Sequence, residues 1–370
     1  MLDKFRFAHV SDTHFGLNSL GTDMPNGLNS RTMDGFQAFD ELIDYAIKNN
    51  LKLIVHSGDV LNTKVVNQSV VNNFYARIKR LSNANIPIYI LQGNHDSSRV
   101  LENLNGLDLA TTLQLPNVYV SRGNDDVLDL GFIQIASVSY WMTSEEIEQK
   151  ISAMAVTIDW TRPAILVVHL QIQYADFPGS FKEDLPFTPL TILTAHPWTY
   201  IAAGHIHKQQ QLNADPPAYY AGSLTRCTFA EEHDPKGFNI VTVNGTKATS
   251  IKQHEVNCLK MLTLKGSMSY IRDLINDASP SAFKDVIVRC IVDEAQEAID
   301  EKYLKDKFQR AFKVVISKLP KPSILKPVRG GNLLSMGDAL LHYFKDDPDK
   351  GALGVLFLEL QLQNEKILER

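Results

Sequence analysis

The sequence has few of the features that mark secreted or membrane proteins. It contains only three cysteines, Cys227, Cys258 and Cys290, and no Cys-x-x-Cys pair. We therefore expect reduced thiols, as in a cytoplasmic protein, and neither disulfides nor a thiolate zinc site. No apolar run approaches the roughly 20 residues that cross a bilayer, so we expect no membrane partner. The first five residues lack the basic head and apolar stretch of a signal peptide.

The chain also lacks an excess of positive charge. Its 37 Lys and Arg residues against 42 Asp and Glu residues give a formal net charge of -5. Proteins that bind nucleic acid tightly on their own usually carry a basic face, because phosphate contacts supply much of the affinity. If the substrate is DNA, the attraction must come from bound divalent cations, from local Lys and Arg side chains, or from a partner.

Residues 1–248 repeat one pattern, in which a short apolar strand is followed by polar residues and then by a helical stretch. Helical periodicity is clearest at 36–48 and 70–81. The expected strands lie at 5–10, 51–55, 86–91, 164–168 and 200–203, with further strands at 132–138, 219–220 and 238–243. Strands that alternate with amphipathic helices predict an α/β domain. The further strands predict more sheet than a simple doubly wound fold has, as in an α+β sandwich.

The pattern changes near residue 249. Residues 249–326 are expected to hold strands at 261–264, 286–292 and 314–316 and helices at 270–276 and 301–312, a small β-α-β-α-β unit. Prolines and glycines then mark a linker, and residues 327–370 form the linker and a helical tail. Its apolar residues recur at helical spacing. The tail either packs as a hairpin on its own domain or presents its apolar face to a partner's coiled coil, which we favour.

Five polar motifs each follow one of the apolar strands. They are Asp12-Thr13-His14, Gly58-Asp59, Gly93-Asn94-His95-Asp96, His169 and Gly204-His205-Ile206-His207. The carboxyl ends of strands in open α/β sheets converge on one crevice, so these side chains should meet. Residues two apart in an extended segment point the same way, so Asp12 with His14, and His205 with His207, should face one cavity. The predicted metal ligands are Asp12, His14, Asp59, Asn94, His169, His205 and His207.

This combination of donors suits two divalent cations. Two cations roughly 3.5–4 Å apart can hold the attacking and leaving oxygens of an in-line phosphoryl displacement, and Asp59 is the candidate bridge between them. Imidazole, carboxylate and amide donors favour Mn²⁺, with Mg²⁺, Fe²⁺ or Zn²⁺ as alternatives. Gly58, Gly93 and Gly204 would let the backbone turn sharply beside the metals. The histidines outside the motifs are taken as structural or surface residues: His9, His56, His196, His233, His254 and His342.

The ordered set of motifs, spanning residues 12–207, resembles that of the calcineurin-like metallophosphoesterases. The resemblance implies a core of β-sheets flanked by helices and two metal positions that share Asp59. It divides the other ligands into one group of Asp12, His14 and His207 and another of Asn94, His169 and His205. It also implies that His95 is a general acid that faces the leaving oxygen and does not bind metal, and that Asp96 orients His95.

Within this family the chain is most similar to the SbcD-like nuclease subunits of DNA repair and their bacteriophage relatives. The similarity includes an Arg31-x-x-Asp34-x-Phe36 pattern and the segments 220–223, 229–232 and 236–238. The β-α-β-α-β unit resembles their DNA-capping domain, and the tail lies where these proteins bind an SbcC-like SMC-type ATPase. The resemblance thus implies DNA and this ATPase as partners and a homodimer of the nuclease subunit.

The leading hypothesis is a metal-dependent DNA exonuclease and endonuclease, the catalytic subunit of an SbcCD-like repair or recombination complex. It would hydrolyse phosphodiester bonds by a two-metal mechanism. The alternatives are a small-molecule phosphodiesterase or phosphomonoesterase and a non-catalytic metal-bearing scaffold. Lys64, Arg99 and Lys208 closely follow metal motifs and are candidates for phosphate contacts. The sequence assigns no role to Asn62, where SbcD-like nucleases more often have Asp or His.

Overall fold

The computed structural model describes residues 4–97, 104–177, 187–212, 214–279, 282–292, 299–308 and 311–318. The chain divides into two compact units, residues 1–319 and 320–370, and every described residue belongs to the first. The predicted linker and helical tail at 327–370 therefore lie outside the described residues. None of the described helices is long and apolar enough to cross a membrane.

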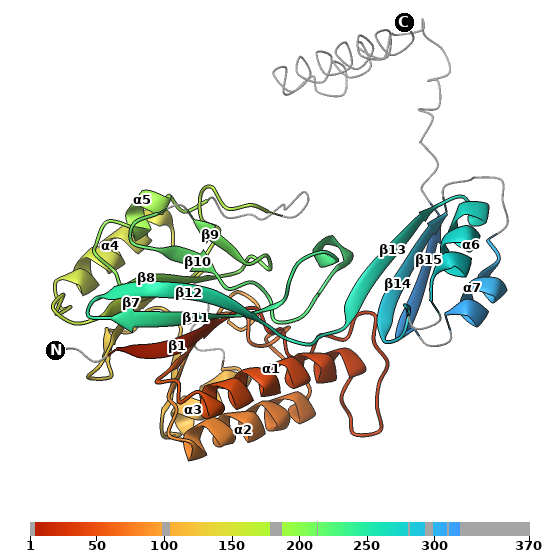
Figure 1. Cartoon of the computed structure of the whole chain (residues 1–370). Helices are drawn as coiled ribbons and strands as arrows, with labels where there is room; N and C mark the ends of the chain where they lie inside the picture. Colours follow the sequence, from red (N-terminus) through yellow and green to blue (C-terminus); the bar gives the residue numbers. More distant parts are fainter. Residues whose placement is uncertain are drawn as a thin grey trace, which may run out of the picture. The chain divides into compact units, whose positions relative to one another are not determined.

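Two six-stranded mixed sheets form the core of the first unit (Figure 1). The first sheet has the order β12 (Lys247–Glu255), β11 (Gly237–Asn244), β1 (Phe5–Val10), β2 (Ile54–Ser57), β3 (Ile88–Leu91) and β4 (Val118–Ser121). The second has the order β5 (Leu128–Asp129), β6 (Gln134–Val138), β7 (Ala164–His169), β8 (Tyr200–Gly204), β10 (Ala218–Tyr220) and β9 (Gln210–Leu212). Strands β1 to β4 run parallel, as do β6, β7, β8 and β10.

Helices cover the outer face of each sheet. Helices α1 (Ser30–Lys48) and α2 (Gln68–Asn83) pack on the first sheet, and α4 (Ser144–Ala155) and α5 (Leu190–Leu193) pack on the second (Figure 1). A third apolar cluster fills the space between the sheets. Successive strand residues point to opposite faces, so in β7 Ile165 packs between the sheets whereas Leu166 faces α4 and α5. The sequence prediction of sheets flanked by helices is confirmed.

Asparagine side chains set the starts of the two long helices. Asn29 accepts a hydrogen bond from the backbone N–H of Arg31 at the start of α1, and Asn67 does the same for Ser69 at the start of α2. Such caps satisfy backbone N–H groups that have no partner within the helix. Both helices therefore begin before the apolar periodicity does, α1 at residue 30 rather than 36.

The Arg31-x-x-Asp34 pattern forms a buried ion pair in α1. Arg31 Nη1 lies 2.7 Å from Asp34 Oδ2, and the Arg31 side chain is fully buried. Arg31 also donates to the carbonyl of Arg226, and Asp34 Oδ1 accepts from the backbone N–H of Leu259 at 3.0 Å. The pair thus attaches α1 to two segments that are distant in sequence, which is a structural role for this pattern.

A three-stranded parallel sheet follows the two large sheets. It consists of β13 (Lys260–Gly266), β14 (Val286–Val292) and β15 (Lys313–Lys318), with α6 (Met268–Asp277) and α7 (Glu301–Lys307) between the strands in sequence. The sheet and its helices share a separate apolar cluster, and the predicted β-α-β-α-β order is confirmed. The predicted boundary at 248/249 falls inside β12, which pairs with β11 in the first sheet. The division into a catalytic and a capping domain stays a prediction.

Candidate metal centre

The five polar motifs lie at or directly after the carboxyl ends of β1, β2, β3, β7 and β8, which come from both large sheets. The side chains that meet there centre on Asp59, which is buried. Its Oδ2 lies 3.3 Å from His169 Nε2 and 3.8 Å from His14 Nε2. The donor atoms of Asp59, His169 and His205 lie within 4.8 Å of one another, and so do those of His14, Asp59 and His95. Asp59 thus belongs to two groups able to hold a cation, the arrangement that a bridging carboxylate requires.

Asn94 directs its amide oxygen at two of these imidazoles, whereas Asp12 bonds the backbone of His205. Asn94 Oδ1 lies 3.1 Å from His169 Nε2 and 3.3 Å from His205 Nδ1, so its amide oxygen faces the same space as these imidazoles. Both carboxylate oxygens of Asp12 accept from the backbone N–H of His205, at 3.0 and 3.1 Å. Asp12 is buried beside the centre, but among the described residues it belongs to none of the groups with converging donors.

The backbone at the metal motifs is left-handed rather than extended. The φ angles are +52° at Asp12, +44° at His14, +54° at Asp59 and +98° at His205. The extended backbone expected at Asp12 to His14 and at His205 to His207 is therefore wrong, although His205 and His207 do line one cavity. The chain instead turns sharply as it leaves β1, β2 and β8. Left-handed conformations cost free energy in residues with a Cβ atom, and their concentration here fits a functional site.

Glycine is required at two positions because the backbone there passes very close to metal ligands. A Cβ atom at Gly93 would lie 2.2 Å from Asp59 Oδ1, and one at Gly58 would lie 2.2 Å from His169 Nδ1. Gly58 also has a φ of +102°, which favours glycine. Any side chain at either position would displace a metal ligand, so only glycine fits there.

His95 lies at the exposed side of the centre. Its Nδ1 is 2.7 Å from the carbonyl oxygen of Asn62, and its own backbone N–H donates to Asp59 Oδ1 at 2.9 Å. A protonated Nδ1 donates to that carbonyl, which leaves Nε2 available to a substrate or a metal. The backbone of Asn62 therefore orients His95, a role that the sequence did not indicate.

Asp96 has a different role from the one implied by the resemblance. Its fully buried carboxylate accepts from the backbone N–H groups of Val60, Leu61 and Gly93, at 3.0, 2.7 and 3.0 Å. Among the described residues it makes no hydrogen bond to His95. A carboxylate held by three N–H groups fixes the turns that carry Asp59 and Asn94, so Asp96 supports the ligand loops and does not orient His95.

Burial and the Asp59 carboxylate control the charge of the cluster. Burial alone would lower the pKa of His169, but the neighbouring Asp59 carboxylate raises it to about 9. At His14, burial dominates and holds the pKa well below its usual value. Burial alone would raise the pKa of Asp59, but His169 and His14 outweigh it and lower that pKa. Because an imidazole must be neutral to bind a cation, metal binding here would release a proton from His169.

Two buried histidines near the strand ends have structural partners. His9 lies 2.9 Å from Tyr200 Oη and 2.8 Å from Ser57 Oγ, and His56 Nε2 lies 3.1 Å from Thr13 Oγ1. Burial lowers the pKa of both imidazoles to about 3, so both are neutral. This agrees with their assignment as structural residues.

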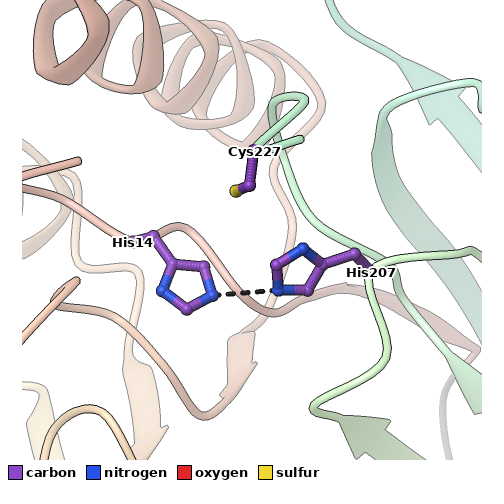
Figure 2. A group of neighbouring side chains, drawn as sticks. All are labelled: His14, His207 and Cys227. Atoms are coloured by element: carbon purple, nitrogen blue, oxygen red, sulfur yellow. Dashed lines mark hydrogen bonds between the residues drawn. The ribbon is translucent and has the colours of Figure 1, made fainter. Parts of the chain in front are cut away.

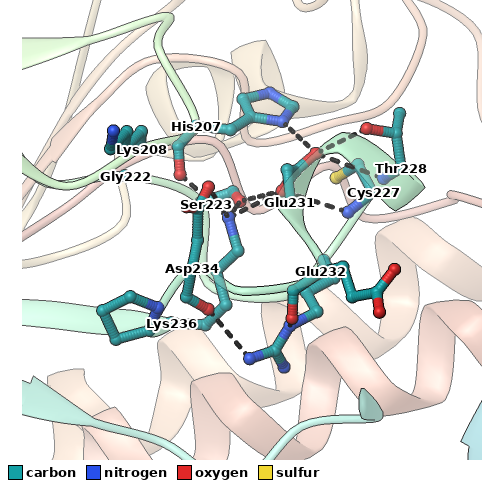
Figure 3. Close-up of polar contacts among 12 residues, drawn as sticks. His207, Lys208, Gly222, Ser223, Cys227, Thr228, Glu231, Glu232, Asp234 and Lys236 are labelled. Carbon is teal, nitrogen blue, oxygen red and sulfur yellow. Dashed lines mark hydrogen bonds and ion pairs between the residues drawn. The ribbon is translucent and has the colours of Figure 1, made fainter. Parts of the chain in front are cut away.

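A carboxylate outside the five metal motifs orients His207 (Figure 3). Glu231 Oε1 lies 3.1 Å from His207 Nδ1, and Glu231 Oε2 lies 2.6 Å from Lys236 Nζ. The fully buried Lys236 Nζ also donates to Ser223 Oγ and to the His207 carbonyl, both at 2.9 Å. With a proton on Nδ1, the lone pair of His207 Nε2 points toward His14 Nε2, 3.0 Å away. A carboxylate that holds a histidine in this way commonly supports a metal ligand.

Cys227 is also close to the centre. Its Sγ and the donor nitrogens of His14 and His207 lie within 4.8 Å of one another (Figure 2). All three cysteines are free thiols. Cys227 follows β10 and belongs to none of the five metal motifs, so the sequence did not indicate its place beside His14 and His207.

The support of His207 by Glu231 can be tested through metal affinity. Glu231→Gln keeps the size of the side chain but removes the charge that fixes the His207 tautomer. We expect one of the two metal positions to bind its cation about 10–100-fold more weakly, while the other position is unchanged. Calorimetric titration with Mn²⁺ at a temperature where the variant is folded measures both. Glu232→Gln is the control, since the Glu232 carboxylate bonds Thr263 instead. Equal affinities in the two variants would contradict this role.

The comparisons with known proteins agree with the motifs. The model of the calcineurin-like phosphoesterase family matches residues 5–209, more than half of the chain. The DNA double-strand break repair protein Mre11 of Thermoplasma acidophilum is 27% identical over 281 residues, which cover 71% of this chain and 66% of that protein. The SbcD component of the nuclease SbcCD from Staphylococcus saprophyticus is 25% identical over 268 residues, which cover 66% of this chain and 67% of that protein. The chain thus spans about two thirds of the length of these relatives.

Among solved structures, a dimetal phosphatase from Danio rerio is similar, with a TM-score of 0.44 and 10% identity, over 68% of this chain and 96% of that chain. The match of the family model includes every predicted ligand from Asp12 to His207. The chain is a member of the calcineurin-like phosphoesterase family and a homologue of the Mre11 and SbcD nuclease subunits.

Proposed function

We propose that this protein is a metal-dependent DNA nuclease, with exonuclease and endonuclease activity, that cleaves phosphodiester bonds at the Asp59 centre. The observation that carries the proposal is the shared position of Asp59 between two groups of converging donors. The relatives named for DNA double-strand break repair and for the nuclease SbcCD support DNA as the substrate. Their similarity extends over 268 to 281 residues, beyond the family core at 5–209.

The donor chemistry fits two divalent cations. One position would be held by His14 and His207 with Asp12 beside them, and the other by Asn94, His169 and His205, with Asp59 shared. Bound cations would polarise the phosphodiester and make water a better nucleophile near neutral pH. We propose Mn²⁺ as the native ion, with Mg²⁺, Fe²⁺ or Zn²⁺ as alternatives.

His95 is the proposed general acid. Asp59 and His169 are buried, whereas His95 is exposed and its Nδ1 is held by the Asn62 carbonyl. The imidazole can therefore meet a substrate that approaches from solvent and protonate the departing oxygen. A surface hollow of about 520 Å³ lies next to it, lined by Asn62, Lys64 and His95 among others. An open site of this kind suits a polymer better than an enclosed pocket does.

Local basic residues could hold the DNA backbone near the centre. Lys64 lines the hollow, and its Nζ lies 5.7 Å from the centre of the Trp141 ring. Lys208 is partly exposed and pairs with Asp176, so it is partly neutralised. Arg99 lies outside the described residues. We therefore propose Lys64 as the first phosphate contact to test.

The cellular location, the oligomeric state and the partner protein are also proposals. We infer that the protein acts in the cytoplasm as a homodimer and as the catalytic subunit of an SbcCD-like complex. The unit at 249–326 would cap DNA, and the tail at 327–370 would bind an SbcC-like SMC-type ATPase through its apolar face. The names of the Mre11 and SbcD relatives support this assignment.

The nuclease assignment predicts a separation of catalysis from metal binding. His95→Asn should keep both metals and bind DNA, but its cleavage rate should fall roughly 10²–10⁴-fold, because a positioned general acid is lost. Cleavage of duplex and single-stranded DNA, a cyclic nucleotide and a generic phosphodiester with Mn²⁺ measures the activity, and elemental analysis measures the metal. His196→Asn, a histidine that stacks on Trp160, is the control and should retain full activity.

Other outcomes of this experiment decide between the alternatives. Loss of metal in His95→Asn would make His95 a ligand, as its place near His14 and Asp59 allows. If the wild-type protein cleaves the small substrates but not DNA, it is a small-molecule phosphodiesterase and not a nuclease. Two bound metals with no hydrolysis of any substrate would favour the scaffold.

The tail gives a separate prediction about the partner. Deleting residues 333–370 should preserve metal binding and cleavage of simple DNA substrates but abolish co-purification with the SbcC-like ATPase. Because a deletion can disturb folding, Leu340→Glu with Leu341→Glu provides a second variant, which should act in the same way. A truncated chain that still co-purifies with the ATPase would place the partner surface elsewhere.

A further inference from the structure

The thiol of Cys227 lies beside the two imidazoles that are proposed to share one cation. Figure 2 shows its sulfur above the gap between the His14 and His207 rings. The donor atoms of these three residues all lie within 4.8 Å of one another, and all three residues line one cavity of about 250 Å³. Cys227 is partly exposed, so its thiol is accessible from that cavity.

The position of Cys227 is fixed by the residue that also fixes His207. Glu231 Oε2 accepts from the backbone N–H of Cys227 at 3.3 Å, and Glu231 Oε1 accepts from His207 Nδ1 at 3.1 Å (Figure 3). The backbone N–H of Thr228 donates to the same carboxylate at 3.1 Å. One buried carboxylate thus sets both the imidazole and the loop that carries the thiol, so their proximity is built into the fold.

The facing imidazoles suit a cation at this place. His14 is 4% exposed, and its Nδ1 has no hydrogen-bond partner among the described residues. His14 Nε2 and His207 Nε2 lie 3.0 Å apart, so one proton is shared between them in the metal-free protein. A cation bound by both nitrogens would take the place of that proton. The separation is close to the roughly 3.3 Å between two nitrogens that bind one tetrahedral Zn²⁺ at 2.0–2.1 Å.

We propose that Cys227 is a thiolate ligand of the metal position shared by His14 and His207. Adding a thiolate to the imidazoles and the shared carboxylate makes the donors of this position softer, so it favours Zn²⁺ more than the other position does. The thiol proton passes to solvent when sulfur binds the cation, and no oxidation or reduction takes place. The inference rests on the dimetal centre of the proposed function but not on its DNA substrate.

Cobalt substitution tests the sulfur bond directly. The full chain is stripped of metal with a chelator and loaded with Co²⁺, whose bond to a thiolate gives a sulfur-to-metal charge-transfer band in the near ultraviolet. The wild-type protein should show the band and Cys227→Ser should lack it, although both bind two ions. Cys258→Ser is the matched control and should keep the band, because Cys258 contacts Arg226 instead.

Competition between Zn²⁺ and Mn²⁺ measures the selectivity. The preference of the His14 and His207 position for Zn²⁺ should fall at least about tenfold in Cys227→Ser. Losing a residue that only supports a ligand already lowers metal affinity by about that factor. Alkylation of the wild-type protein, followed by mass spectrometry, avoids any variant. Zn²⁺ should protect Cys227 from the reagent, Mn²⁺ should protect it less, and Cys258 should react equally with either ion.

The outcomes separate this inference from the proposed function. Two Co²⁺ ions without a charge-transfer band, a band that persists in Cys227→Ser, or no protection by Zn²⁺ would each overturn the role of Cys227 and leave the dimetal centre intact. Fewer than two bound ions in the wild-type protein would instead contradict the dimetal centre itself.

Discussion

The carboxylate of Asp59 is the group on which the rest of the centre depends. It is buried within 4 Å of imidazole nitrogens from both halves of the domain, His14 and His169. A buried negative charge is costly unless it is compensated. Here the compensation comes from imidazolium in the metal-free protein and would come from cations in the loaded one. Replacement of the proton on His169 by a cation couples metal binding to pH, with tighter binding as pH rises.

The fold brings compensating groups to the buried Asp59 charge. It does so by packing two sheets face to face and ending their central strands at one edge. The left-handed turns at Asp12, His14, Asp59 and His205 are strained, and the bonds around them hold them in place. Asp96 braces the turns of the second and third motifs through three backbone N–H groups. Glu231 and the buried Lys236 brace the fifth. The ligands are thus held by a surrounding shell of polar residues.

Much of this arrangement could be predicted because strand patterns and metal motifs are local in sequence. The strands before each motif and the β-α-β-α-β unit were predicted close to their observed positions. Strand β12 was missed because its charged and polar residues, from Lys247 to Glu255, suit an exposed edge strand and do not form an apolar run. The roles of Glu231, Cys227 and the Asn62 carbonyl could not be predicted, since each depends on a contact across at least 20 residues. Contacts of this kind leave no spacing pattern in a single sequence.

The central claim is that two cations share Asp59, and anomalous X-ray scattering from crystals soaked in Mn²⁺ tests it most directly. We expect two anomalous peaks, one on each side of the Asp59 carboxylate. One peak should lie within bonding distance of His14 and His207, and the other within bonding distance of Asn94, His169 and His205. A single peak, or two peaks of which only one contacts Asp59, would contradict the shared centre.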